Sequence, residues 1–241
     1  YDRLYDELVA LETSSGIQLS DSPTRNVGYA SVDELPKIAH EKPMLSLDKT
    51  KDREALRDWL NGHEALLSWK LDGLTIVLTY NKGKLVSGVT RGNGIIGEVV
   101  TENVKQFKNI PLEIPYKDKL VLRGEAIIKY SDFNRMNDEI SNDGETADVD
   151  AKYKNPRNLC SGSVRQLDSK ITSKRNVNII IFALIEAKDI MDSKEEQFKW
   201  LQSLGFETVQ RVVVDKNNIR EEVLNYKNVY VLYIYLKNSE I

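Results

Sequence analysis

A β-hairpin in the first half of the chain places the strongest limit on what this sequence can fold into. Residues 74–80 (LTIVLTY) and 84–90 (KLVSGVT) read as strands, and the three residues NKG between them include a glycine. Two strands joined by so short a turn must run antiparallel, because a parallel pair needs a crossover of a dozen residues or more. The sequence therefore predicts an antiparallel sheet built around this hairpin.

The glycine-rich segment RGNGIIGE follows the hairpin at residues 91–98 and contains the spacing G-x-G-x-x-G. In dinucleotide-binding folds this spacing follows the first strand of a βαβ unit and opens a helix. Here the glycines follow the second strand of an antiparallel hairpin instead. A doubly wound NAD site of the dehydrogenase type is therefore not expected, and the glycines must serve other chemistry.

The composition narrows the class of protein further. Of 241 residues, 41% are hydrophobic and 29% are charged, no apolar run approaches the roughly 18 residues of a membrane span, and no leader opens the chain. We therefore expect a cytoplasmic protein without a membrane partner. The single cysteine, Cys160, excludes an internal disulfide and a multi-cysteine zinc site, so a metal would take oxygen ligands. The net charge of −3 argues against indiscriminate nucleic-acid binding, although a local basic face remains open.

Hydrophobic periodicity and capping signals predict the other elements and the division of the chain. An amphipathic helix at 1–12 is followed by a turn-rich connection, so we expect a short N-terminal piece, 1–28, and a main domain, 29–241. Because the chain begins at Tyr1 inside a helix, it reads as a fragment. Further strands are expected at 65–70, 119–128 and 177–185, the last buried on both faces, and further helices at 49–62, 131–140 and 193–205.

Lys70 stands at the end of the predicted strand 65–70, beside the turn-forming pair Asp72 and Gly73. Strand alternation places Leu66, Ser68 and Lys70 on one face. A lysine surrounded by apolar side chains loses hydration, which favours the neutral, nucleophilic amine. The alternative is a lysine at the rim of the sheet with its ammonium group in water.

Several motifs taken together decide between these readings. They are KLDG at 70–73, TRGNGIIGEVVTENV at 90–104, LRGEAII at 122–128, KNPRNLCSGSVRQLDSKITSKR at 154–175, and the entry segments DSPTRNVG at 21–28 and HEKPMLSLD at 40–48. In this order they resemble the adenylation domain of bacterial NAD-dependent DNA ligases, from Tyr1 to about Gly205. The resemblance implies an α+β nucleotidyltransferase fold, with antiparallel sheets flanked by helices.

The resemblance also implies the chemistry and the residues that perform it. Lys70 attacks the adenylyl phosphate of NAD, nicotinamide mononucleotide leaves, and AMP passes to the 5′ phosphate of nicked double-stranded DNA. Asp72 orients Lys70 or holds Mg²⁺ through water, and no residue is assigned as a direct metal ligand. Arg157 and Arg165 contact phosphates of the cofactor or the DNA. The residues expected to bind NAD or AMP are Ser46, Leu47, Ser68, Lys70, Leu71, Arg91, Glu125, Phe182 and Lys237, with Tyr1 and Asp2 at the nicotinamide half.

Four departures from the family pattern accompany these motifs. Ser68 replaces the glutamate that reads the adenine amino group, Asn93 replaces an aspartate, and Phe182 replaces the adenine-stacking tyrosine. If Lys237 is the lysine of the family motif D-G-x-V-x-K, then Leu232 and Tyr233 occupy the acid and glycine positions. We therefore expect this chain to be monomeric and to seal nicks poorly on its own.

Two other functions remain open from the sequence. An ATP-using nucleotidyltransferase also carries K-x-D-G, although TRGNGIIGE and NPRN belong to the NAD type. A degenerate ligase-like protein that binds nucleotide or DNA without turnover is favoured by the altered tail and by Ser68.

Overall fold

The computed structural model describes residues 2–15, 35–44, 50, 52–142, 152–219 and 232–236. Within those ranges no helix has the length and apolar character needed to cross a membrane. The helices are α1 (Asp2–Ser15), α2 (Arg53–Leu60), α3 (Thr101–Val104), α4 (Tyr130–Asn142), α5 (Pro156–Val164), α6 (Ser169–Lys174) and α7 (Lys194–Ser203). The strands are β1 (Lys37–Ala39), β2 (Ala65–Trp69), β3 (Leu74–Asn81), β4 (Lys84–Thr90), β5 (Ile96–Glu98), β6 (Leu120–Ile127), β7 (Asn178–Glu186), β8 (Arg211–Val214) and β9 (Leu232–Leu236).

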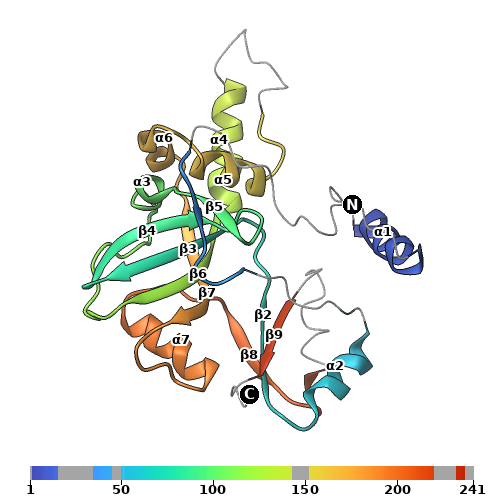
Figure 1. Cartoon of the computed structure of the whole chain (residues 1–241). Helices are drawn as coiled ribbons and strands as arrows, with labels where there is room; N and C mark the ends of the chain where they lie inside the picture. The colour runs from blue at the N-terminus through green and yellow to red at the C-terminus, as the bar shows by residue number, and fades with distance from the viewer. Residues whose placement is uncertain are drawn as a thin grey trace.

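A four-stranded antiparallel sheet in the order β4-β3-β6-β7 forms the centre of the fold (Figure 1). The predicted hairpin is confirmed: β3 and β4 pair from Ile76 opposite Thr90 to Asn81 opposite Lys84. Its turn consists of Lys82 and Gly83, both with positive φ (51° and 78°), a backbone conformation that glycine adopts at little cost. The expected mixed architecture of helices and antiparallel sheet is therefore correct.

One face of this sheet carries the main hydrophobic core. Ile76, Leu78 and Leu122 are completely buried there, in one cluster with side chains from α3, α4 and α5. Cys160 of α5 belongs to this core as a buried thiol. Because alternate residues of a strand point to opposite faces, Thr75, Arg123 and Glu125 lie on the other face. That other face is the one available for a functional site.

A second, three-stranded antiparallel sheet in the order β8-β2-β9 lies beside the first, with α2 packed on it (Figure 1). Leu66 of β2 packs with Phe198 of α7 and Val209, and half-buried Phe182 of β7 packs against the same cluster. The two sheets therefore meet through apolar contacts between β2 and β7. A third, two-stranded pairing joins β1 to β5, and β5 is the last part of the glycine segment 91–98.

The predicted element boundaries need small corrections. Helix α2 begins only at Arg53, because the Asp52 carboxylate accepts hydrogen bonds from the amides of Glu54 and Ala55 and so caps the helix there. Strand β7 was expected to be buried on both faces, but its Ile180 and Phe182 are only half-buried. They face the junction of the two sheets rather than a closed core. The N-terminal helix extends to Ser15, and the division at residue 28 lies outside the described residues and stays a prediction.

Candidate active site

The turn that follows Lys70 is bound to the neighbouring strand β6. Lys70 comes directly after β2, and the chain turns through Gly73 into β3. The Gly73 amide donates a 3.1 Å hydrogen bond to Oε1 of Glu125, and Thr75 Oγ1 donates a 2.7 Å hydrogen bond to Oε2. Lys70 and Glu125, which come from separate motifs, are therefore brought to one place on the sheet.

The Glu125 carboxyl is held in an environment that opposes its ionisation. Burial raises its pKa, because desolvation disfavours the carboxylate. The hydrogen bonds from Thr75 and Gly73 and the positive charges of Lys70 and Arg157 act to lower the pKa, but the net direction is upward. Glu125 is therefore a buried carboxyl group that the Gly73 amide and the Thr75 hydroxyl hold in place near Lys70 and Arg157.

Gly73 has a steric reason to be glycine. A Cβ atom at this position would overlap the backbone carbonyl oxygen of Ala126 on β6. The close approach lets the turn dock on β6 and lets its amide reach Glu125. The glycine of the K-x-D-G motif therefore sets the distance between Lys70 and strand β6.

Asp72 and Arg157, predicted for different roles, form an ion pair at the edge of this turn. Arg157 Nη1 donates to Asp72 Oδ1 at 2.6 Å, and the two side chains are 47% and 70% exposed. Arg157 lies in the first turn of α5, which begins at the N-cap Asn155. The arginine also lines a pocket of about 150 Å³ together with Gly73, Leu74, Asn158, Ser161 and Gly162.

The glycine loop that contains Arg91 is closed by its own backbone. Gly92 and Gly94 have φ of 56° and 92°, and the Arg91 carbonyl accepts from the Gly94 amide at 3.0 Å. Asn93 Oδ1 accepts from the amides of Ile95 and Ile96 at 3.0 and 2.8 Å. An asparagine therefore supplies the same acceptor oxygen that an aspartate would supply at this position.

The segment 40–44 is bound to the same loop. The His40 and Met44 amides donate to the carbonyls of Ile95 and Gly94, at 2.8 and 2.7 Å. His40 Nε2 lies 3.1 Å from the Arg91 carbonyl, a contact the sequence analysis missed. The sequence did offer a reason to consider His40, because it is the first residue of the motif HEKPMLSLD. The described part of this motif therefore orders the loop around Arg91.

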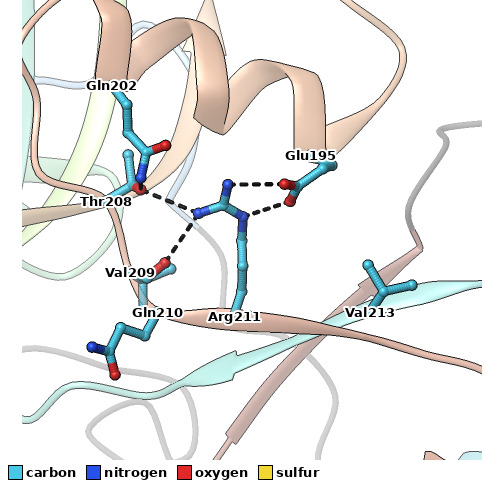
Figure 2. A pocket seen from close by; sticks show the side chains of 7 residues that line it. All are labelled: Glu195, Gln202, Thr208, Val209, Gln210, Arg211 and Val213. Atoms are coloured by element: carbon cyan, nitrogen blue, oxygen red, sulfur yellow. Dashed lines mark hydrogen bonds and ion pairs between the residues drawn. The ribbon is translucent and has the colours of Figure 1, made fainter.

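Ser68 and Phe182 lie at the junction of the two sheets. Ser68 is 3% exposed and stands directly opposite Arg211 of β8. Arg211 is already paired with Glu195 of α7, at 2.7 Å from Nε and 3.3 Å from Nη2 (Figure 2). Position 68 therefore carries a small buried hydroxyl opposite an arginine whose charge Glu195 neutralises.

A second hollow, of about 500 Å³, lies around Arg211, on the side of α7 (Figure 2). Its lining residues are Glu195, Gln202, Thr208, Val209, Gln210, Arg211 and Val213. No predicted site residue is among them. Of the predicted site residues, Arg157 lines the smaller pocket, beside Gly73.

Arg165 is not brought to the Asp72–Arg157 pair. It is the C-cap residue of α5, whereas Arg157 is in the first turn, so the length of the helix, about 12 Å, separates their backbones. Arg165 Nε lies 2.8 Å from Oε2 of Glu98, and the two side chains are 16% and 0% exposed. Glu98 is a second residue that the sequence analysis missed, although it stands in the quoted motif after the glycines.

Some of the predicted residues lie outside the described part of the chain. Tyr1, Ser46, Leu47 and Lys237 lie outside the described residues, and Asp2 is described only as the start of α1. Leu71 is half-buried between Lys70 and Asp72. The backbones of Leu232 and Tyr233 begin β9, opposite Trp69 and Ser68 of β2. Residues 232–236 therefore form a strand that pairs with β2, the strand that directly precedes Lys70.

Residues 32–231 match the family model described as the NAD-dependent DNA ligase adenylation domain. A DNA ligase of Lachnoclostridium phytofermentans is 59% identical over 92% of this chain and 33% of its own length. A DNA ligase of Ruminiclostridium cellulolyticum is 55% identical with the same coverage, and one of Helicobacter acinonychis is 39% identical over 94% of this chain and 35% of its own. The chain thus spans about a third of the length of the curated relatives it matches.

Proposed function

The chain belongs to the NAD-dependent DNA ligase adenylation-domain family, and on that premise we propose that Lys70 is the residue that becomes adenylylated. Lys70 Nζ attacks the adenylyl phosphorus of NAD, the new N–P bond forms, and the P–O bond to nicotinamide mononucleotide breaks. The lysine proton leaves to solvent, so the product is a lysyl-AMP. The observation that carries this proposal is the docking of the turn 70–73 on Glu125, which holds Lys70 at the exposed edge between the two sheets.

The adenosine half of NAD fits the sheet face opposite the main core. Glu125 can accept hydrogen bonds from ribose hydroxyls, and Arg91 lies in the glycine loop, where backbone can approach phosphate closely. Phe182 offers an aromatic face for the base, and Ser68 is too short to replace a glutamate directly. The further residues proposed to complete the nucleotide site are Ser46, Leu47, Leu71 and Lys237, with Tyr1 and Asp2 at the nicotinamide half.

The residues of this site fit a Mg²⁺ ion that Asp72 would hold through water rather than a Mg²⁺ ion bound directly by several protein ligands. Within the described ranges, no group of three or more His, Cys, Asp or Glu residues could hold a metal ion. Mg²⁺ is usually held by one or two carboxylates together with substrate phosphates and water. Asp72 is the exposed carboxylate next to Lys70 and is the proposed protein contact. A bound Mg²⁺ would neutralise developing charge on the phosphate.

We further propose that AMP is passed to the 5′ phosphate of nicked DNA, in replication and repair in a bacterial cytoplasm. Arg157 is the proposed phosphate contact, since its guanidinium is exposed beside the small pocket and its partner Asp72 is also exposed. This transfer is an activity of whole ligases, and this chain spans a third of such relatives. A monomer is the state in which we expect it to act.

Intact-mass measurement after incubation with NAD, ATP or neither tests the proposal. A mass increase of one AMP with NAD and Mg²⁺ only is expected, and it should be absent in Lys70→Ala. Adduct formation with ATP alone would support the ATP-using alternative. Binding of NAD without any adduct would support a nucleotide-binding protein without turnover, which Ser68 and the altered tail favour. An undiminished NAD adduct in Lys70→Ala would exclude Lys70 as the nucleophile.

A further inference from the structure

Asn103 of α3 binds the backbone on both sides of Arg165. Its side chain is buried, and Nδ2 donates to the carbonyls of Val164 and Gln166 at 2.6 and 2.7 Å. Thr172, itself fully buried, shares its hydroxyl proton between the Ser163 carbonyl at 2.7 Å and Asn103 Oδ1 at 3.1 Å. Buried amides whose hydrogen bonds are satisfied on several sides have few alternative orientations. The main chain at Arg165 is therefore fixed from α3, which directly follows the glycine loop and β5.

The side chain of Arg165 is directed back to that same segment. Arg165 Nε meets the fully buried carboxylate of Glu98 at 2.8 Å. The Glu98 amide donates to Thr90 Oγ1 at 3.0 Å, and Thr90 immediately precedes Arg91. A buried carboxylate is strongly unfavourable unless a cation compensates it. Arg165 thus stabilises Glu98, and Glu98 joins the two ends of the glycine loop.

We infer that Arg165 is a positioning residue for the glycine loop, acting through Glu98, while Asn103 fixes the backbone from which it acts. This role differs from a contact of Arg165 with cofactor or DNA phosphate. It rests on the proposed function only in that the loop carries Arg91 toward NAD. It means that the orientation of residues 91–97 depends on the ion pair between Arg165 and buried Glu98.

Removing the two charges separately and together tests this role. Arg165→Met removes the cation that lies 2.8 Å from the buried Glu98 carboxylate, so we expect the KM for NAD in lysyl-AMP formation to rise by about tenfold or more. Adding Glu98→Gln removes the negative charge that Arg165 balances, and the KM should return to that of the Glu98→Gln single variant. A phosphate contact predicts the opposite, because the double variant still lacks the guanidinium. Partial unfolding alone would lower kcat through the number of active molecules and leave KM unchanged.

A matched control and a second readout make the result decisive. Arg135→Met with Glu139→Gln removes an exposed ion pair of 2.7 Å on α4 and should leave KM unchanged. Hydrogen exchange of the amides of residues 92–97 should accelerate in Arg165→Met and recover in the double variant. That readout holds even if the wild-type chain forms no lysyl-AMP, which would contradict only the proposed function. A double variant that fails to fold, or that folds but keeps the raised KM or the fast exchange, overturns the inference.

Discussion

Thr75 and Glu125 face each other directly across β3 and β6, and the threonine hydroxyl donates a 2.7 Å hydrogen bond to the carboxylate. The other carboxylate oxygen holds the Gly73 amide, so one side chain orients both the strand and the turn that leads from Lys70. The proposed ribose contact is therefore also the residue that places the proposed nucleophile. Changes at Glu125 should affect binding and chemistry together.

The raised pKa of Glu125 predicts a specific pH dependence of stability. Its folded-state pKa lies above the ordinary value of 4.5, so between the two the folded protein binds more protons than the unfolded chain. The free energy of unfolding should therefore fall as pH rises from 4.5 through the folded-state pKa. Urea unfolding of the wild type and Glu125→Gln over this range measures the effect. Parallel pH profiles for the two proteins would contradict the prediction.

Gly73→Ala should destabilise the chain by about 1–3 kcal/mol, because the added Cβ overlaps the Ala126 carbonyl and forces the turn off β6. Lysyl-AMP formation should fall with it, since Lys70 moves with the turn. Gly162→Ala is the matched control: it lies in helix α5 and its Cβ would meet no atom within 4 Å. That substitution should be neutral or stabilise by about 0.5–1 kcal/mol in chemical denaturation. Equal effects of the two substitutions would refute the steric argument.

Arg157→Ala should change activity without changing stability. Its ion pair with Asp72 is exposed, and such pairs contribute about 0–1 kcal/mol. If Arg157 meets a phosphate of NAD, the substitution should slow NAD-dependent lysyl-AMP formation, and if it meets the DNA phosphate it should slow only the transfer of AMP to nicked DNA; in both cases the urea midpoint should stay close to that of the wild type. Arg57→Ala, which removes an exposed arginine paired with Glu54 at 3.6 Å on α2, should alter neither. A large loss of stability in Arg157→Ala would instead indicate a structural role.

Asn93→Ala should weaken NAD binding, because the amides of Ile95 and Ile96 lose their shared acceptor and the loop loses its closed form. The expected loss is about 1 kcal/mol for each hydrogen bond. Asn93→Asp keeps the acceptor oxygen and should bind NAD as the wild type does. Calorimetric titration of the three proteins checks this. If the alanine variant binds normally, the loop does not depend on Asn93.

The sequence predicted the elements that depend on local interactions. The β3–β4 hairpin, the helix α7 with its Ser193 N-cap and the strands β6 and β7 all appear within a few residues of their expected positions. The resemblance of several motifs predicted the family, which the family model and the curated relatives confirm.

The partners of the site residues were not predictable in the same way. Asp72 and Arg157 were assigned separate roles, yet they pair at 2.6 Å, and Arg165 was grouped with Arg157 although it pairs with buried Glu98. Periodicity reports which face a side chain occupies, because that depends on the residue's immediate neighbours along the chain. It does not report which residue of another segment occupies the facing position, because that depends on strand register and helix docking. The sequence by itself therefore determined the family and the main elements and proposed the residues of the site, whereas only the tertiary structure decided which charges neutralise one another.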